Sequence, residues 1–197
     1  MIQLVGSDYG GHYLDVDRIQ DGDVVLDAGV GSDLSFALSV LNIAALNIAA
    51  IKLVFVDPDI HTIGEKASRL GVVINGALSD RDGVGVFYRS VGNQSSGSLL
   101  ANHRNAAIGT PVELVSAARL MREHGFAIVK LDIEGSEYDV LPLFIGARQI
   151  SVEFHHVIVR GYSLADTAEL ISLMRRADYE VHRMTEWDYL FIRECDA

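Results

Sequence analysis

Short apolar runs alternate with longer amphipathic stretches along most of this chain, and this alternation limits the possible fold more than any other feature. We expect strands in five runs, at 24–29, 52–57, 72–78, 126–134 and 150–156. Helices fit between or after these runs, at about 33–49, 60–70, 113–124, 137–147 and 164–177. Strands that alternate with helices form βαβ units and a parallel sheet. The sequence therefore predicts an α/β fold with a doubly wound, mostly parallel sheet.

The pattern changes near the end of the chain. Two strand-like runs, 179–184 and 188–195, are joined by residues 185–187, which are too few for a crossover helix. Strands joined in this way pair antiparallel, so we expect an antiparallel last strand. One extra strand is also expected at 85–90, outside the regular alternation.

Local signals refine this pattern. Ser136 with Asp139, and Ser163 with Asp166, have the spacing of capping boxes, which predicts helix starts at both places. Residues 92–98 are rich in glycine and small polar residues. Loops of this kind lie on protein surfaces and sometimes act as lids, so we expect a mobile lid there.

Length and charge narrow the class of protein. With 197 residues, 49% of them hydrophobic, the chain can form one substantial core. We expect a single domain over 1–197, in which 1–22 form a short N-terminal extension or hairpin. The net charge of −11 argues against binding to nucleic acid or to an anionic membrane. The sequence carries no signal for an oligomeric state.

The single cysteine, Cys195, leaves no partner for a disulfide or a cysteine cluster within the chain. The first residues lack the basic and apolar regions of a secretory signal. Together these features predict a cytoplasmic protein.

One apolar stretch, 34–56, has the length of a membrane span. Its first part has helical spacing, whereas 52–56 is a short β-branched run that ends at Asp57-Pro58. We therefore predict a helix followed by a buried strand, and no membrane-spanning segment.

The first predicted strand ends in the turn DAGVG at 27–31. Gly29 and Gly31 allow a ligand to approach the backbone closely at the carboxyl edge of the sheet, although a tight turn without a ligand is the alternative. The third glycine of a dinucleotide fingerprint is missing, because Leu34 stands there. Asp27 suits a cationic ligand better than a pyrophosphate, and it can bind the ammonium of S-adenosylmethionine directly or through water.

The second predicted strand ends at Asp57. A carboxylate at this place has two acceptor oxygens and can bind both hydroxyls of a ribose. Alternatively, Asp57-Pro58 merely starts a helix. Because the turn at 27–31 lies at the same edge of the predicted sheet, ligand binding is the better interpretation.

The fourth predicted strand carries three charged residues at alternate positions, Lys130, Asp132 and Glu134, which therefore share one face. Charges inside a sheet are costly unless they are paired, so we interpret Lys130 as the partner of a carboxylate. Glu134 could simply stabilise the start of a helix. We expect at least one of the two acids to contact a ligand, because ligands bind above the strand ends.

The fifth predicted strand places Glu153 and His155 on one face and His156 on the other. We expect Asp132, Glu134, Glu153 and His155 to form one catalytic cluster, with His155 as the preferred base because imidazole titrates near neutrality. Packing explains adjacent histidines equally well. No ligand spacing is diagnostic, so no metal is predicted, and Mg²⁺ held by these groups is the alternative.

Six segments occur in a characteristic order: VVLDAGVGSDLSF, FVDPD, NGALSD, SGSL, IVKLDIEGSEYDVL and VEFHH. This series resembles FkbM-type S-adenosylmethionine-dependent methyltransferases, and KLDIEGSE is its most specific part. The resemblance implies a class I methyltransferase fold, a Rossmann-like sheet with an antiparallel last strand. It also implies S-adenosylmethionine as the cofactor, and O-methylation of a hydroxyl on a small molecule or sugar.

The resemblance also implies roles by position. The residues implied in cofactor binding are Asp27, Gly29 and Gly31 in the first motif, Asp57 as the ribose acid, Ala77, Leu78 and Ser79 at the adenine edge, and Asp132 in the motif after strand four. Many family members have a DxGANxG turn where this chain has DAGVGSD, a departure that leaves the acceptor open.

Two other functions remain as alternatives. One is a module that binds S-adenosylmethionine without turnover, which the polar residues on strands four and five argue against. The other is a nicotinamide-dependent oxidoreductase, disfavoured by the missing third glycine and by the acidic residues around the turn.

Overall fold

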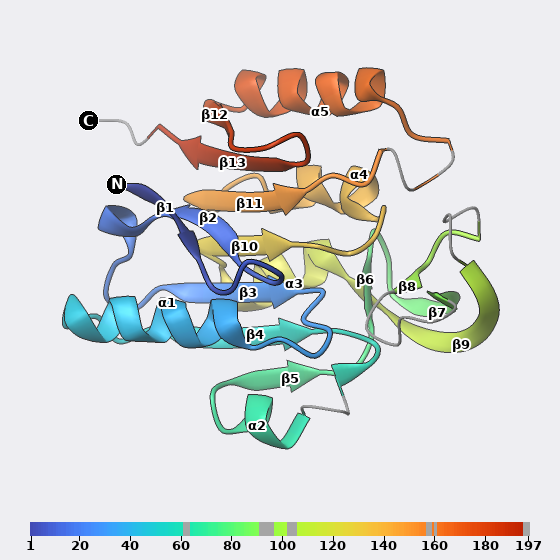
Figure 1. The fold of residues 1–197 in the computed structure, drawn as a ribbon, viewed down its shortest axis with the longest axis horizontal. Helices are drawn as coiled ribbons and strands as arrows, with labels where there is room; N and C mark the ends of the chain where they lie inside the picture. Colours follow the sequence, from blue (N-terminus) through green and yellow to red (C-terminus); the bar gives the residue numbers. More distant parts are fainter. Residues whose placement is uncertain (61–63, 91–96, 102–105, 157–158, 160, 195–197) are drawn as a thin grey trace.

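The computed structural model describes residues 1–60, 64–90, 97–101, 106–156, 159 and 161–194. Its central feature is a seven-stranded sheet (Figure 1). The strands lie in the order β12 (Tyr179–Arg183), β13 (Asp188–Arg193), β11 (Gln149–Glu153), β10 (Ile128–Leu131), β3 (Val24–Ala28), β4 (Lys52–Val56) and β5 (Val72–Ile74).

The sheet is mainly parallel. The five strands from β11 to β5 run in one direction. The strand β13 pairs antiparallel with both β11 and β12, as predicted from the short connection between the last two strands. The chain therefore has a mixed α/β fold.

Helices follow most strands. Their bounds are α1 (Ser35–Leu46), α2 (Gly64–Ser68), α3 (Ala117–His124), α4 (Glu137–Val140) and α5 (Leu164–Arg176), and α4 continues into the 3₁₀ helix η3 (Leu141–Phe144). The stretch 34–56 divides into α1 and β4, as the sequence predicted. No helix in the described part of the chain combines the length and apolar character that a membrane crossing requires.

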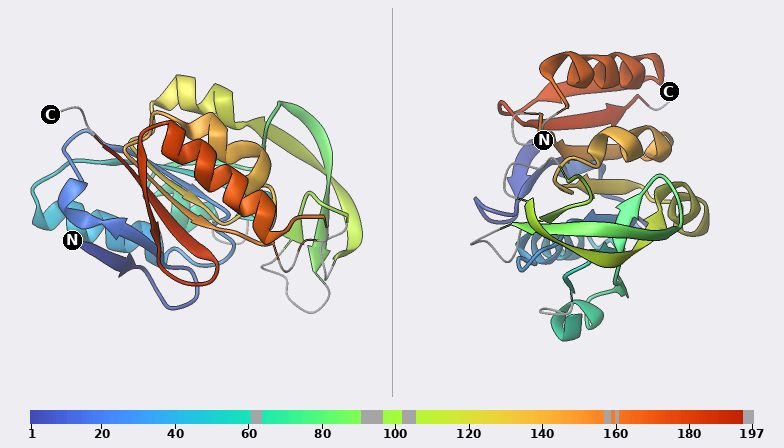
Figure 2. Two further views of the ribbon diagram at one scale, coloured as in Figure 1. Left: turned by 90° about the horizontal axis from the view of Figure 1, so that it is seen from above. Right: turned by 90° about the vertical axis from the view of Figure 1, so that its right-hand side faces the viewer.

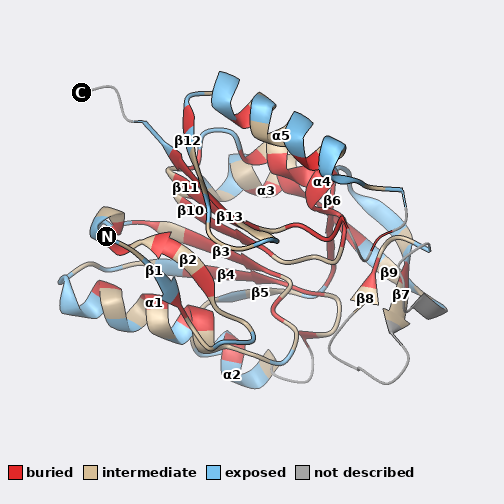
Figure 3. Ribbon diagram, turned by 45° about the horizontal axis from the view of Figure 1, so that its top comes forward, coloured by how far each residue is buried: buried red, intermediate tan, exposed pale blue. Residues whose placement is uncertain are grey.

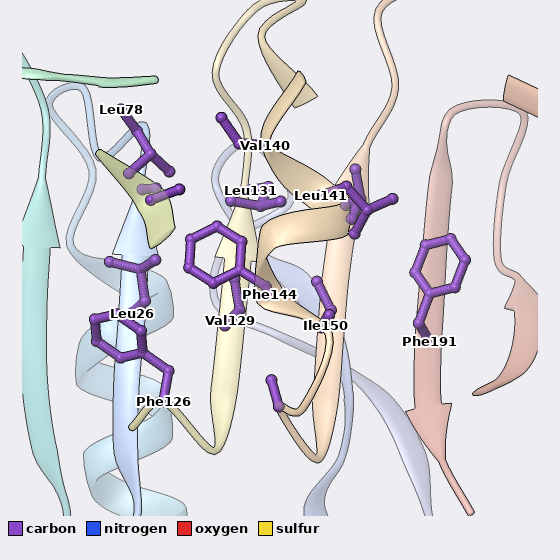
Figure 4. Packing of buried hydrophobic residues seen from close by; sticks show 14 of the residues in the cluster. Leu26, Leu78, Phe126, Val129, Leu131, Val140, Leu141, Phe144, Ile150 and Phe191 are labelled. Atoms are coloured by element: carbon purple, nitrogen blue, oxygen red, sulfur yellow. The ribbon is translucent and has the colours of Figure 1, made fainter. Parts of the chain in front are cut away.

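Consecutive side chains of a strand point to opposite faces of the sheet. Other elements cover both faces, so the parallel strands contribute to two apolar clusters. Leu26 belongs to one apolar cluster, with residues of α3, α4, η3 and α5 (Figure 4). Val25 belongs to a second cluster, with residues of α1, α2 and the N-terminal residues. Figure 2 shows these two groups of elements on opposite sides of the sheet. The inner strands β3, β4, β10 and β11 are thus almost entirely buried, while the edge strand β5 and the outer faces of α1 and α5 are partly exposed (Figure 3).

The first residues form an antiparallel hairpin, β1 (Ile2–Val5) and β2 (His12–Asp15), followed by the 3₁₀ helix η1 (Val16–Arg18). This agrees with the expected N-terminal hairpin. The hairpin is held against the sheet by Gln149 of β11, whose side-chain oxygen accepts the backbone N–H of Asp15 at 3.0 Å. The amide nitrogen of Gln149 donates to the Asp15 carbonyl at 3.2 Å.

A second, four-stranded sheet lies beyond the arrowheads of the parallel strands (Figure 1). Its strands lie in the order β6 (Ala77–Ser79), β9 (Ala106–Ser116), β7 (Gly83–Ser90) and β8 (Gly97–Ser98). The expected extra strand at 85–90 is part of β7, which begins two residues earlier, at Gly83. The regular alternation contains no signal for a second sheet of this kind.

Two predicted elements are wrong because of this second sheet. The run 72–78 is divided between β5 and β6. The strand is interrupted near Gly76, where a Cβ would lie 2.6 Å from the Val115 side chain. The helix expected at 113–124 begins only at Ala117, because residues up to Ser116 pair with β6 and β7. Long-range strand pairing has overridden the local helical pattern.

The two predicted capping boxes differ in outcome. Ser163 accepts the backbone N–H of Ala165, and Asp166 accepts the backbone N–H of Ser163, so this box is present. The box at Ser136 is wrong, because its side chain makes no capping hydrogen bond. Its backbone is already helical, with φ −78° and ψ −3°, whereas a capping side chain needs an extended backbone.

Candidate functional site

A cavity of about 370 Å³ lies at the carboxyl ends of β3, β4, β10 and β11. This volume falls within the range of pockets for small molecules and cofactors. Its wall consists of the turns after these four strands, one edge of the second sheet and the hairpin loop Asp8–Gly10. The sequence predicted the strand ends as walls of the site, but not the hairpin loop.

The turn after β3 depends on its glycines. Gly29 and Gly31 have φ of +77° and +55°, in the left-handed region that favours glycine. A Cβ on Gly29 would lie 1.7 Å from the carbonyl oxygen of Asp132. The turn therefore packs directly against the chain after β10, and both glycines line the cavity as predicted.

Asp27 and Lys130 are neighbours on adjacent strands and almost fully buried. Lys130 Nζ lies 3.1 Å from Asp27 Oδ1 and donates to the Gly29 carbonyl at 2.8 Å. Burial alone would lower the pKa of Lys130, but the carboxylates of Asp27 and Asp132 raise it above its usual value. The predicted pairing of Lys130 with a carboxylate is confirmed.

This pairing changes the interpretation of Asp27. Lys130 lines the cavity, whereas Asp27 is not among the lining residues. In this structure Asp27 is the counter-ion of Lys130, and its contact with a ligand ammonium, directly or through water, stays a prediction.

Asp57 lines the cavity and is only 6% exposed. Its carboxylate accepts the backbone N–H of Gly31 at 2.9 Å and that of Asp59 at 2.6 Å, one at each oxygen. Burial raises the pKa of Asp57 above its usual value. Each oxygen keeps a second lone pair, so the carboxylate can still accept hydrogen bonds from two ligand hydroxyls.

The predicted adenine edge is the short strand β6. Ala77 and Leu78 line the cavity, together with Phe87 of β7, whereas Ser79 is buried but not part of the lining. Phe87 was missed because the extra strand carried no motif that pointed to a ligand. These three side chains give this side of the cavity an apolar wall.

An ion pair joins the second sheet to the turn after β4. Arg89 Nε of β7 donates to Asp59 at 3.1 Å, and its Nη1 donates to Thr110 Oγ1 of β9 at 2.8 Å. Asp59 also lines the cavity. The apolar wall is therefore tied to the turn that carries Asp57.

The cavity lining also includes the predicted polar cluster, and the four residues of this cluster do converge. His155 Nε2 lies 3.7 Å from Asp132 Oδ1, 3.7 Å from Glu134 Oε2 and 3.9 Å from Glu153 Oε1. All four residues line the cavity. The parallel strands β10 and β11 bring them together because their carboxyl ends lie side by side.

A fifth member of this cluster, Glu137, was not predicted. Its carboxylate lies 3.1 Å from His155 Nδ1 and accepts the backbone N–H groups of Ile133 and Gly135, both at 2.8 Å. Glu137 is fully buried. It fixes both the imidazole and the turn that carries Glu134, whose backbone has a φ of +54°.

The electrostatics disagree with the base role predicted for His155. Burial lowers the pKa of His155, but Glu137, Asp132 and Glu134 outweigh this effect and raise it to about 10. An imidazole that keeps its proton at neutral pH cannot take one up. Burial, reinforced by the charge of Asp132, raises the pKa of Glu153 to about 7. Burial also acts to raise the pKa of Asp132, but His12 and Lys130 outweigh this effect and lower it.

Two further expectations concern the surroundings of the cluster. His156 faces away from the cavity, as predicted, and stacks on Trp187 with ring centroids 5.4 Å apart. Residues 91–96 of the expected lid lie outside the described residues. Gly97 lines the cavity, and Ser98 donates to the Glu134 carbonyl at 2.6 Å.

His12 is the other residue that the sequence did not single out. It starts β2, is 2% exposed, and its Nε2 lies 4.0 Å from Asp132 Oδ2. A lone histidine in a short hairpin has no spacing that points to a site, so only the docking of the hairpin onto the sheet reveals it.

A family model described as the methyltransferase FkbM domain matches residues 38–181. The matched segment includes Asp57, the strand β6 and the whole cluster around His155, whereas the glycine turn and His12 precede it. Among curated proteins, none matches this chain. Because the FkbM model covers well over half of its length, the chain belongs to the FkbM family of methyltransferases.

Proposed function

We propose that this methyltransferase binds S-adenosylmethionine in the cavity and passes the methyl group to a hydroxyl of a small molecule or sugar. The strand order, with elements packed on both faces of the sheet, fits the doubly wound, Rossmann-like sheet of a class I methyltransferase. Ligands of such sheets bind above the carboxyl ends of the strands. The observation that carries the proposal is that one cavity has both a glycine turn beside Asp57 and a carboxylate cluster.

The residues of the cavity fit the parts of the cofactor. The backbone at Gly29 and Gly31 allows close approach of the amino-acid end, and Asp57 has lone pairs for the two ribose hydroxyls. The apolar wall of Ala77, Leu78 and Phe87 suits an adenine ring. The amino-acid end, the ribose and the adenine ring of the cofactor each have suitable residues in the cavity lining.

When bound, S-adenosylmethionine supplies an electrophilic methyl group on a positively charged sulfur. The acceptor oxygen forms the new O–C bond as the S–C bond breaks, and the hydroxyl proton leaves. Glu134 and Glu153 both line the cavity and can take up this proton. His155, hydrogen-bonded to Glu137, holds the carboxylates in place.

Positioning supplies most of the rate in such a displacement, because the acceptor oxygen must lie in line with the methyl group. The hydrogen bonds of Glu137 to the turn after β10, and of Arg89 to Asp59, support two walls of the cavity. The proposed acceptor is a single hydroxyl-bearing molecule that enters beside the carboxylate cluster.

Calorimetry and methyl transfer test this proposal. We expect S-adenosylhomocysteine to bind with one site per chain, and NAD⁺ and NADH not to bind. With ¹³C-methyl-labelled S-adenosylmethionine and a panel of sugars and hydroxylated small molecules, we expect one class of product in which the label gives the carbon shift of a methyl ether.

Two results would overturn the proposal. Binding of NADH in place of S-adenosylhomocysteine would favour an oxidoreductase. Binding of S-adenosylhomocysteine without transfer to any hydroxyl, nitrogen or carbon acceptor would favour a binding module without turnover.

A further inference from the structure

His12, Asp132 and Glu153 bring one imidazole nitrogen and two carboxylates close together at the edge of the cavity, where Asp132 and Glu153 belong to its lining. One potential ligand atom from each residue lies within 4.8 Å of the other two. Ligands of one Mg²⁺ or Mn²⁺ ion, with bonds of about 2.1 Å, lie up to about 4.2 Å apart. Small side-chain rotations therefore suffice to bring all three atoms onto one ion.

The geometry of His12 is that of a prepared ligand. Its Nδ1 lies 3.1 Å from Ser151 Oγ, which fixes the ring, and its Nε2 faces Asp132. Metal-binding histidines typically have the other ring nitrogen hydrogen-bonded in this way. At 4.0 Å from Asp132 Oδ2, Nε2 is too far for a hydrogen bond. His12 is only 2% exposed, because the hairpin that carries it packs against the sheet.

The local charges favour a cation at this point. Asp132 and Glu153 are acidic neighbours on adjacent strand ends, and Glu134 lies close by. Lys130 Nζ also lies 4.0 Å from Asp132 Oδ2, but it is paired more closely with Asp27. On the other side, the protonated His155 also faces Asp132 and Glu153, but it is paired most closely with the buried Glu137. Because Lys130 and His155 each have their own carboxylate partner, the acidic groups around this point still outnumber the cationic ones.

We propose that His12, Asp132 and Glu153 bind a divalent cation of the Mg²⁺ or Mn²⁺ type. One nitrogen and two carboxylate oxygens suit such an ion and leave coordination positions open toward the cavity. The hairpin that supplies His12 precedes the segment matched by the FkbM model. The cation site is thus assembled by an N-terminal element that closes one side of the polar cluster.

The role of this cation rests on the proposed function, whereas its binding does not. A cation here lies beside the acceptor wall and can bind the acceptor hydroxyl as a further ligand. Coordination lowers the pKa of the hydroxyl, and Glu134, which is not one of the three ligands, can take up its proton. No redox change or additional reactant is needed.

Titration with Mn²⁺ after treatment with a chelator tests the site, with unbound Mn²⁺ measured by electron paramagnetic resonance. We expect one bound ion per chain. His12→Ala and Asp132→Asn should each weaken binding by about 10-fold or more, and Ser151→Ala, which removes only the partner of His12, by about 10-fold. His182→Ala, at a half-buried histidine of β12 that pairs with Glu180, is the matched control and should bind Mn²⁺ as the unmodified chain does.

A spectroscopic signature identifies the ligand directly. Bound Mn²⁺ should show electron spin echo modulation from one ¹⁴N nucleus, and His12→Ala should abolish it. If His12→Ala fails to fold, the affinity for Mn²⁺ is measured in Ser151→Ala, which keeps His12, and in Glu153→Gln, which changes a residue of the cavity wall. An unmodified chain that binds no Mn²⁺, or modulation that persists in folded His12→Ala, would overturn the site.

Binding of S-adenosylhomocysteine in the presence of a chelator separates the two proposals. Binding without the cation, together with one Mn²⁺ site that depends on His12, supports both. If S-adenosylhomocysteine binds neither with the chelator nor with added Mn²⁺, while Mn²⁺ binds, the proposed function is overturned and the cation site stands. If S-adenosylhomocysteine binds but the unmodified chain binds no Mn²⁺, the cation site alone is overturned.

Discussion

Lys130 Nζ lies 3.1 Å from Asp27 Oδ1 in the middle of the parallel sheet, where both side chains are almost completely buried. Neighbouring strands place the two residues directly opposite each other. Since Lys130 also donates to the carbonyl of Gly29, the pair supports the turn that forms one wall of the cavity. The fold and the site therefore share this ion pair.

Replacement of Lys130 should destabilise the protein strongly. Lys130→Met leaves the charge of Asp27 buried without a partner, and we expect the free energy of unfolding to fall by about 3–5 kcal/mol. Urea denaturation at pH 7 measures this loss. Lys52→Met, at the exposed start of β4, is the control and should change stability by less than about 0.5 kcal/mol.

The double variant Asp27→Asn, Lys130→Met should lose less stability than the sum of the two single variants, because neither charge is then left unpaired. Additive losses would show that the ion pair does not couple the two residues.

Gly29→Ala should be much more damaging than Gly22→Ala, although both glycines have similar positive φ, +77° and +83°. At Gly22 a Cβ meets nothing within 4 Å, so only the backbone strain of about 1–2 kcal/mol is expected. At Gly29 the Cβ also collides with the Asp132 carbonyl, which forces β3 and β10 apart. Thermal unfolding and S-adenosylhomocysteine calorimetry compare the two variants, and equal effects would rule out the close contact.

Asp57→Ala should weaken the binding of S-adenosylhomocysteine by about 1.5–3 kcal/mol, the usual contribution of hydrogen bonds to a charged group. The fold should persist, because Asp57 lies in a turn at the end of β4. Isothermal titration calorimetry measures the affinity. Asp21→Ala, which removes an acceptor for the Ala50 N–H at the other end of the sheet, should leave the affinity unchanged. Unaltered affinity in folded Asp57→Ala would remove Asp57 from the site.

Arg89→Met should loosen the second sheet from the turn after β4, since it removes the bonds to Asp59 and Thr110. We expect faster hydrogen exchange in β6 and β7 and about 3- to 10-fold weaker S-adenosylhomocysteine binding, roughly the net contribution of one ordinary hydrogen bond, because Arg89 acts on the cavity only through Asp59. Arg81→Met is the control, because Arg81 is exposed and pairs only with Asp80 among the described residues. Slow exchange in Arg89→Met would show that the ion pair does not hold the sheet.

The sequence predicted the parts of the fold that depend on local patterns. Mostly apolar runs at 24–29, 52–57, 126–134 and 150–156 identified β3, β4, β10 and β11, because a strand that is buried on both faces is apolar at most of its positions. The residues that follow these strands then had to meet at one edge of the sheet. This is why Asp57, Asp132, Glu134, Glu153 and His155 could be assigned to one site before their distances were known.

Only the tertiary structure decided which groups complete that site. His12 reaches Ser151 across 139 positions of sequence, and Glu137 turns back from a helix start to hold His155. Asp27 pairs with Lys130 rather than with the cavity, and β9 displaces the start of a predicted helix. Such contacts join residues that are distant in sequence, and their free energy comes from docking whole elements together, so no local periodicity records them.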